Sequence, residues 1–215
     1  FNHRGSGLVG SLGTDGQHML SAGAGKTNVF ETVAAGGGAW EMINTTTISS
    51  GVTDFTVDNV FSATYKVYKL LYHGVNFSEA GYPEFQFVTG GDGTVAEDSD
   101  YHTKYQFMYG AITGGTHSDG NQNASSGFRF TSVYTREVQD DYEQAGDITL
   151  YNPFDDSYYN TFQGWVTNPR ASHYERFQLF GAYSGDKISA TGYKISVNTG
   201  DIDEGEFTLL GLKRA

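Results

Sequence analysis

Acidic side chains are the most numerous chemically active groups in this chain, with 25 Asp and Glu residues among 215. Two loops gather them at close spacing, which offers the oxygen ligands that Ca²⁺ prefers. The two sets are Asp92, Glu97, Asp98 and Asp100, and Asp201, Asp203 and Glu204. Acidic turn residues also commonly cap backbone groups, and the second loop lacks the length and order of a helix-loop-helix calcium site. The sequence therefore predicts no metal site and no cofactor, with Ca²⁺ as the alternative.

Paired carboxylates would also serve glycoside hydrolysis, in which one acid protonates the leaving oxygen and the other attacks the sugar or activates water. The available acids are Asp140, Asp141, Glu143, Asp155 and Asp156. A chain so rich in acids contains such pairs by chance, and it has neither a Cys nor a Gly-x-Ser-x-Gly nucleophile elbow. We assign no catalytic residue and predict a protein that is not an enzyme, with a glycan depolymerase as the alternative.

Histidine spacing does not indicate a metal centre. The six histidines are His3, His18, His73, His102, His117 and His173. No two of them form the close i, i+2 or i, i+4 pair that is typical of zinc and iron sites. One histidine from each of three chains could still meet on a three-fold axis, whereas scattered loop or surface histidines are the interpretation that we favour.

Aromatic side chains are the remaining chemical resource, with 15 Tyr, 15 Phe and 2 Trp. Exposed Tyr and Trp beside polar groups suit sugar binding, because a ring face packs on pyranose C–H groups while polar atoms bond the hydroxyls. Most of these rings are expected in the core or in a subunit interface. The side chains that we assign to ligand contact are Tyr158, Tyr159, Trp165 and Tyr174.

Short β-strands are the elements that would position these side chains. The chain has 29 Gly and only 3 Pro, and apolar residues alternate with polar ones in many short runs separated by Gly- and Asp-rich turns. The predicted strands are 40–43, 45–48, 55–57, 64–72, 84–88, 105–109, 128–131, 147–151, 161–166, 177–183, 193–197 and 206–212. Apolar residues on both faces of 64–72 predict a central strand. The pattern predicts an all-β protein, an antiparallel β-sandwich of jelly-roll type.

The chain divides by composition at Gly36-Gly37-Gly38, which has the character of a hinge. Residues 1–38 form a Gly-rich leader with too little apolar surface to offset the entropy of ordering, so we expect it to be extended or disordered unless another chain holds it. Residues 39–215 form the predicted sandwich. The start at Phe1 lacks an initiator Met and an apolar signal core, which indicates a cleavage product or the first ordered residue of a longer polypeptide.

The net charge is −12, with 13 Lys and Arg against the 25 acids. Such a surface repels phosphate backbones and anionic lipid, so we expect no nucleic-acid or membrane partner. No apolar run approaches the roughly 18 residues of a transmembrane helix.

Both ends of the chain resemble bacteriophage proteins. The leader 13–25, GTDGQHMLSAGAG, resembles a short element of phage tail fibres and related fibrous virion proteins. The body resembles a domain of phages that infect cyanobacteria and other marine bacteria. It shares a Tyr-Lys-x-Tyr-Lys strand at 65–69, a strand ending in Asn-Pro at 150–153, and a closing G-x-I-x-x-G-x-F-x-L-x-G pattern at 200–211.

The resemblance implies a structural component of the phage particle, extracellular and most often a homotrimer. Residues 1–38 would dock to other virion proteins, and the sandwich would recognise a host surface ligand such as a glycan. The alternative within the same resemblance is a capsid decoration or head-fibre protein, in which the sandwich cements the shell.

Overall fold

The computed structural model describes residues 17–20, 29–32, 39–79, 81–90, 92–96, 100–111, 114–130, 142–170 and 173–213. By its internal contacts the chain divides into two units, Phe1–Gly38 and Ala39–Ala215. In the first unit, β1 (Gln17–Leu20) and β2 (Val29–Thr32) form an antiparallel pair. The rest of the leader, which the sequence predicts to be extended, lies outside the described residues.

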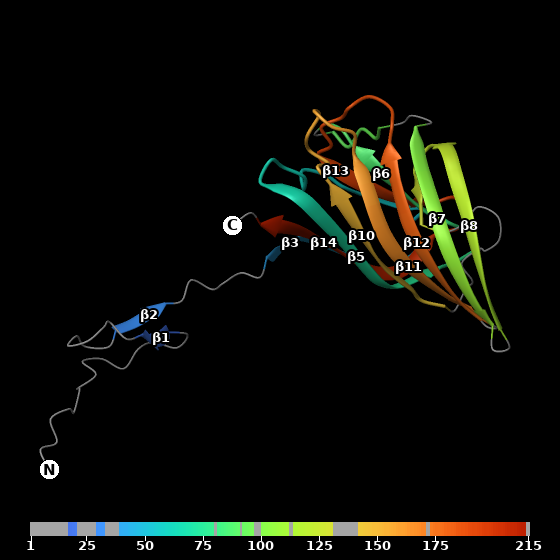
Figure 1. Ribbon diagram of the computed structural model, residues 1–215, viewed down its shortest axis with the longest axis horizontal. Coiled ribbons are helices and arrows are strands. Elements are labelled where there is room, and N and C mark those ends of the chain that lie inside the picture. The colour runs from blue at the N-terminus through green and yellow to red at the C-terminus, as the bar shows by residue number, and fades with distance from the viewer. Residues whose placement is uncertain are drawn as a thin grey trace, which may run out of the picture. The chain divides into compact units, whose positions relative to one another are not determined.

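The second unit is built from β-strands, and no helix occurs in the ranges that the structure describes (Figure 1). The all-β prediction is confirmed. The strands are β3 (Trp40–Ile48), β4 (Asp54–Val57), β5 (Tyr65–Phe77), β6 (Pro83–Val88), β7 (Tyr101–Ala111), β8 (Gly114–Ser125), β9 (Phe128–Arg129), β10 (Gln144–Tyr151), β11 (Thr161–Arg170), β12 (His173–Tyr183), β13 (Gly192–Val197) and β14 (Ile202–Lys213).

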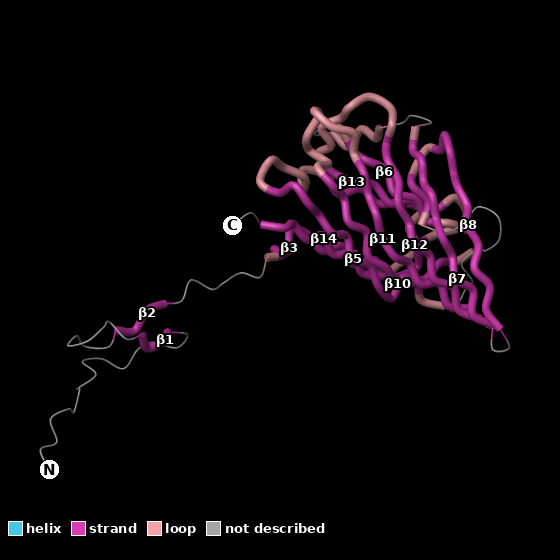
Figure 2. The backbone as a smooth tube through the Cα atoms, viewed as in Figure 1, coloured by secondary structure: helices cyan, strands magenta, loops and turns pink. Residues whose placement is uncertain are grey.

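These strands form two antiparallel sheets that pack face to face. The larger sheet has eight strands in the order β3-β14-β5-β10-β11-β12-β7-β8, and the smaller has four in the order β4-β13-β6-β9. The chain passes repeatedly between the sheets, from β3 through β7 and again from β12 through β14, which is the wrapping that a jelly roll requires. The predicted β-sandwich is confirmed, and Figure 2 shows its loops gathered mainly at one end.

The core between the sheets is mainly aromatic. Phe128 of β9 contacts Phe162 of β11 with their ring centroids 4.0 Å apart, and Phe55 of β4 lies 4.9 Å from Phe207 of β14. These contacts join the smaller sheet to the larger one at widely separated points. Because each strand buries every second side chain in this layer, the intervening side chains must point outward.

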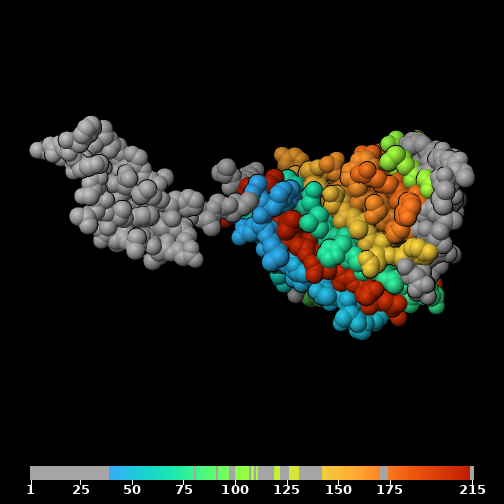
Figure 3. All heavy atoms as spheres, turned by 90° about the horizontal axis from the view of Figure 1, so that it is seen from below, coloured from blue at the N-terminus to red at the C-terminus, as the bar shows by residue number. Residues whose placement is uncertain are grey.

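The outward side chains of the larger sheet form a broad surface, which we call the outer face. Figure 3 shows strands of this sheet as successive bands, from β3 in blue through β14 in red and β5 in teal to the orange of β12. The smaller sheet covers the opposite side of this sheet, and none of the described strands covers the outer face.

Candidate ligand-binding face

Strand alternation places polar and aromatic side chains together on the outer face. On β11, Phe162 and Val166 are buried. Gln163, which follows Phe162, and Thr167, which follows Val166, are exposed. Trp165 points the same way as these polar residues and is half-buried. The neighbouring strands β10 and β12 alternate in the same manner, so their outward residues extend the surface on both sides.

The register of the sheet brings residues far apart in the sequence into one row. Trp165 of β11 pairs with Asp147 of β10 on one side and with Gln178 of β12 on the other. In the next row, Gln163 pairs with Thr149 of β10. Paired residues on one face of an antiparallel sheet have their Cβ atoms about 5 Å apart, so these side chains are direct neighbours.

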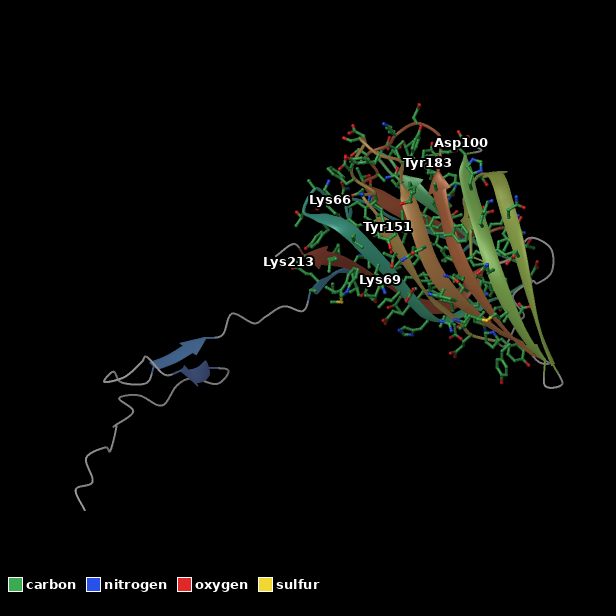
Figure 4. All side chains as sticks on the ribbon, viewed as in Figure 1. Lys66, Lys69, Asp100, Tyr151, Tyr183 and Lys213 are labelled. Carbon is green, nitrogen blue, oxygen red and sulfur yellow. The ribbon has the colours of Figure 1, made fainter. Side chains whose placement is uncertain are left out.

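The first hollow on the outer face, which we call the polar hollow, lies over β5, β10, β11 and β12. Its volume is about 250 Å³ and its outward-pointing lining residues are Lys69, Asp147, Thr149, Gln163, Trp165 and Gln178. The Lys69 Nζ lies 3.6 Å from the Asp147 Oδ2, and Figure 4 labels Lys69 on β5. The hollow thus combines an ion pair, amide and hydroxyl groups with one indole ring.

The second hollow, which we call the apolar hollow, has a volume of about 430 Å³. Its lining includes Met108 of β7, Pro169 of β11, and Tyr174 and Arg176 of β12. The Tyr174 side chain is 73% exposed. The Arg176 guanidinium stacks over the Trp165 ring, 4.1 Å from its centroid, and this pair connects the two hollows.

A buried polar network supports the outer face from behind. The amide of Gln144 donates to the Asn168 Oδ1 over 3.2 Å, and the amide of Asn168 donates to the Glu175 Oε2 over 3.0 Å. These residues come from β10, β11 and β12, and each is at most 2% exposed. The network ties together the three strands that carry Trp165 and Arg176, which favours a rigid surface.

The structure brings two of the four sequence-predicted ligand residues to this face. Trp165 and Tyr174 both line hollows of the outer face. Tyr158 and Tyr159 lie instead in the loop between β10 and β11, 63% and 53% exposed, and neither lines either hollow. The Lys187 ammonium lies 5.7 Å from the centre of the Tyr159 ring.

Sequence analysis missed Lys69, Asp147 and Arg176 as members of the site. Their types carry no motif, and what unites them is the order of the strands. The available signal was the alternation of polar residues along 161–169 and 174–180, which marks one open face on each of two strands.

The first acidic loop caps its own turn. The Asp92 Oδ1 accepts hydrogen bonds from the Thr94 hydroxyl at 2.6 Å and the Thr94 N–H at 3.0 Å, and these bonds lower the pKa of Asp92. Glu97 and Asp98 lie outside the described residues. Among the residues that the structure describes, no group of three or more His, Asp or Glu side chains is arranged to hold a metal ion.

The carboxylates considered for hydrolysis are dispersed. Asp140 and Asp141 lie outside the described residues, and Glu143 lines the apolar hollow. Asp155 and Asp156 line a separate hollow of about 250 Å³ near the loop end of β5. There the Asp155 Oδ2 accepts a hydrogen bond from the Lys66 ammonium at 2.6 Å.

The Lys66–Asp155 pair predicts a specific pH dependence. The Lys66 hydrogen bond, followed by that from the Ser157 N–H, holds the pKa of Asp155 below its ordinary value of 3.8. A lowered folded-state pKa contributes stability above the unfolded pKa, and this contribution is lost as the pH falls through the folded pKa. Urea unfolding measured from pH 7 to pH 3 should therefore show a smaller loss of stability on acidification for Asp155→Asn than for the parent protein.

The matched control for this experiment is Asp156→Asn. Asp156 forms no ion pair with any described residue, so this variant removes the same charge without removing an ion pair. Equal curves for the parent protein and Asp155→Asn would contradict the assignment.

Comparison of the chain with family models and with curated proteins finds no match. Within the described ranges, nothing helical has the length and apolar character needed to cross a bilayer.

Proposed function

We propose that this chain is a non-enzymatic structural protein of a phage particle, a tail-fibre or receptor-binding component, and that its sandwich binds a host surface glycan on the outer face. The observation that carries the glycan proposal is the setting of Trp165. Its indole ring borders a hollow whose other outward groups are amides, a hydroxyl and an ion pair.

This setting has the two properties that sugar binding needs. An aromatic ring provides a surface for the apolar face of a pyranose, and the surrounding amides and hydroxyls both donate and accept hydrogen bonds. Gln178 lies in the same row as Trp165 and Gln163 in the next row, so a sugar in the hollow beside the ring would have polar partners in reach. The outward residues of the larger sheet continue across neighbouring strands on both sides of the hollow, which suits a long polymer.

The proposed location in the particle rests on the resemblance of the leader 13–25 to tail-fibre elements. In this proposal residues 1–38 dock to other virion proteins, and three copies of the chain assemble into a homotrimer. The outer face of each copy would then be presented to the host, and multivalent contact would raise the avidity of weak individual sites.

The test is binding to an array of bacterial capsular polysaccharides and lipopolysaccharide O-chains. We expect at least one glycan to bind and Trp165→Ala to weaken that binding at least about tenfold, because truncating an aromatic anchor at a binding hot spot costs about 2 kcal/mol or more. The matched control is Tyr82→Ala, since Tyr82 also has an arginine over its ring, Arg129 at 3.9 Å, but directly precedes β6 of the smaller sheet.

The control should bind as the parent protein does. Failure of every glycan to bind, or equal loss in both variants, would contradict the proposal. Release of reducing sugar from a bound polysaccharide would favour the depolymerase and overturn the non-enzymatic part.

A second candidate function, decoration of the capsid, is favoured by the edge strand β3. Trp40 and Met42 are 37% and 69% exposed and pair with Leu212 and Leu210 of β14. An apolar strip on an unpaired strand edge suits contact with another protein. Binding of the purified chain to assembled shells but not to host cells would favour this function over host recognition.

A further inference from the structure

The outer face carries basic side chains on a strongly acidic protein. The chain has a net charge of −12, yet Lys69, Lys104 and Arg176 all point outward from the larger sheet. Lys104 lies on β7 and Arg176 on the adjacent β12, and both are exposed.

Most other cations of the described body are paired with acids. Lys66, Arg129, Lys194 and Lys213 each lie within 4.0 Å of a carboxylate oxygen. On the outer face, Lys69 pairs with Asp147 in the same way.

Arg176 and Lys104 differ from these cations. Neither forms an ion pair within the part of the chain that the structure describes. The described acids that point outward from the larger sheet include Asp147, which pairs with Lys69, Glu206, which lies 3.4 Å from His73, and Asp119 on β8. Glu143 and the buried Glu175 line the apolar hollow. Two cations are therefore available on the face that we propose as the glycan site.

The position of these two cations fits one extended ligand. Arg176 pairs with Met108, and Phe180, four residues further along β12, pairs with Lys104. At about 3.3 Å per residue, the two cations are about 13 Å apart along the strands. Gln178 and Gln106 form the row between them, and Trp165 lies beside that row.

Arg176 is preorganised to bind an anion while remaining stacked. Its guanidinium carbon lies over Trp165, 4.1 Å from the ring centroid, and this contact holds the guanidinium group at the outer face. A stacked guanidinium can still donate two parallel hydrogen bonds to a planar or tetrahedral oxyanion.

We propose that the ligand of the outer face is an acidic polysaccharide, whose carboxylate or sulfate groups bind Arg176 and Lys104 while a sugar ring lies beside Trp165 in the polar hollow, away from the ring face that Arg176 covers. This inference rests on the proposed glycan-binding function and adds the chemical class of the glycan. Local positive charge is needed because the remainder of the protein repels an anionic polymer.

The test uses calorimetric titration of the full chain with two matched pairs of polymers. Dextran and dextran sulfate share one backbone, as do polygalacturonate and its methyl ester. We expect a charged member to bind at least about tenfold more tightly than its neutral partner, and added salt to weaken that binding. Tighter binding of dextran sulfate would indicate a preference for sulfate groups, and tighter binding of polygalacturonate a preference for carboxylate groups.

The variants locate the effect. Arg176→Gln and Lys104→Gln should each remove much of the preference for the charged polymer, whereas Lys194→Gln, the same loss of one positive charge on the smaller sheet, should retain it. Arg176→Lys keeps the charge but loses the planar guanidinium group and its paired N–H donors, so it should give an intermediate affinity.

Each outcome has a distinct meaning. Tight binding of a neutral polymer that Trp165→Ala abolishes and the charge variants do not affect would overturn the acidic class and leave glycan binding standing. Equal losses in Lys194→Gln and in the face variants would show non-specific attraction and overturn the inference. No binding to any polymer or to the glycan array would overturn both proposals.

Discussion

Replacing Phe128 with alanine is expected to lower the free energy of unfolding by about 3–5 kcal/mol. Phe128 is 1% exposed, and its ring centroid lies 4.0 Å from that of Phe162 and 4.7 Å from that of Tyr101, both on the larger sheet. It stands on β9, a strand of two residues with few backbone bonds of its own. The ring therefore provides much of the attachment of β9 to the sandwich, and its removal leaves a cavity among aromatic groups.

Guanidinium unfolding followed by tyrosine and tryptophan fluorescence measures this loss. The control is Phe180→Ala, because Phe180 lies on the outer face and is 48% exposed. It should cost less than about 1 kcal/mol. Similar losses for the two variants would mean that Phe128 is not part of a packed core.

Replacing Gly192 with alanine is expected to destabilise the protein by about 3 kcal/mol or more. A Cβ at this position would overlap the Val57 carbonyl oxygen and lie 2.7 Å from the Asp58 Cα. Both obstacles are backbone atoms, so no side-chain rotation relieves them. Gly192 begins β13, which pairs with β4 and β6 at the centre of the smaller sheet, and the strain would spread to both neighbours.

Thermal unfolding of Gly192→Ala and Gly110→Ala provides the comparison. At Gly110 the nearest atom to an added Cβ is the Tyr174 carbonyl oxygen at 3.8 Å, an ordinary contact. Gly110→Ala should change stability by less than about 1 kcal/mol. A Gly192→Ala protein as stable as the parent would show that β4 and β13 are not packed this closely.

The sequence predicted strands wherever apolar and polar side chains show the pattern of a buried or half-buried strand. The strong run 64–72 corresponds to β5, which lies inside the larger sheet between β14 and β10, as apolar residues on both of its faces predict. The alternating run 84–88 corresponds to β6. In both cases burial selects the side chains, so the sequence contains the signal.

Strand β8 was missed for a physical reason. Gly114 and Gly115 have turn chemistry, and the segment 114–125 is rich in Gly, Asn and Ser, which have low β-propensity. Its pairing with β7 comes from backbone hydrogen bonds at the edge of the sheet, which any residue but proline can make. Sequence analysis also did not predict β1 and β2, although Val, Phe and Thr of β2 favour a strand.

The sequence predicted the kind of site, a surface with exposed aromatic rings, but it did not predict which other residues lie beside them. Exposed aromatic residues pointed to Trp165 and Tyr174, because ring type is visible in the sequence. Lys69 and Arg176 joined the same face only through the order β5-β10-β11-β12, which depends on contacts between distant segments. Alternation shows which residues share a face of one strand, but the neighbouring strand is set by the fold as a whole.

Fluorescence of the two tryptophans tests the central claim most directly, because the chain has only Trp40 and Trp165. Trp40→Phe leaves Trp165 as the sole indole, and Trp165→Phe leaves Trp40 on β3. Titration with polygalacturonate and with dextran sulfate should change the emission of Trp40→Phe and leave that of Trp165→Phe nearly constant. A change that persists in Trp165→Phe and vanishes in Trp40→Phe would place the ligand at the β3 edge and contradict binding at the centre of the outer face.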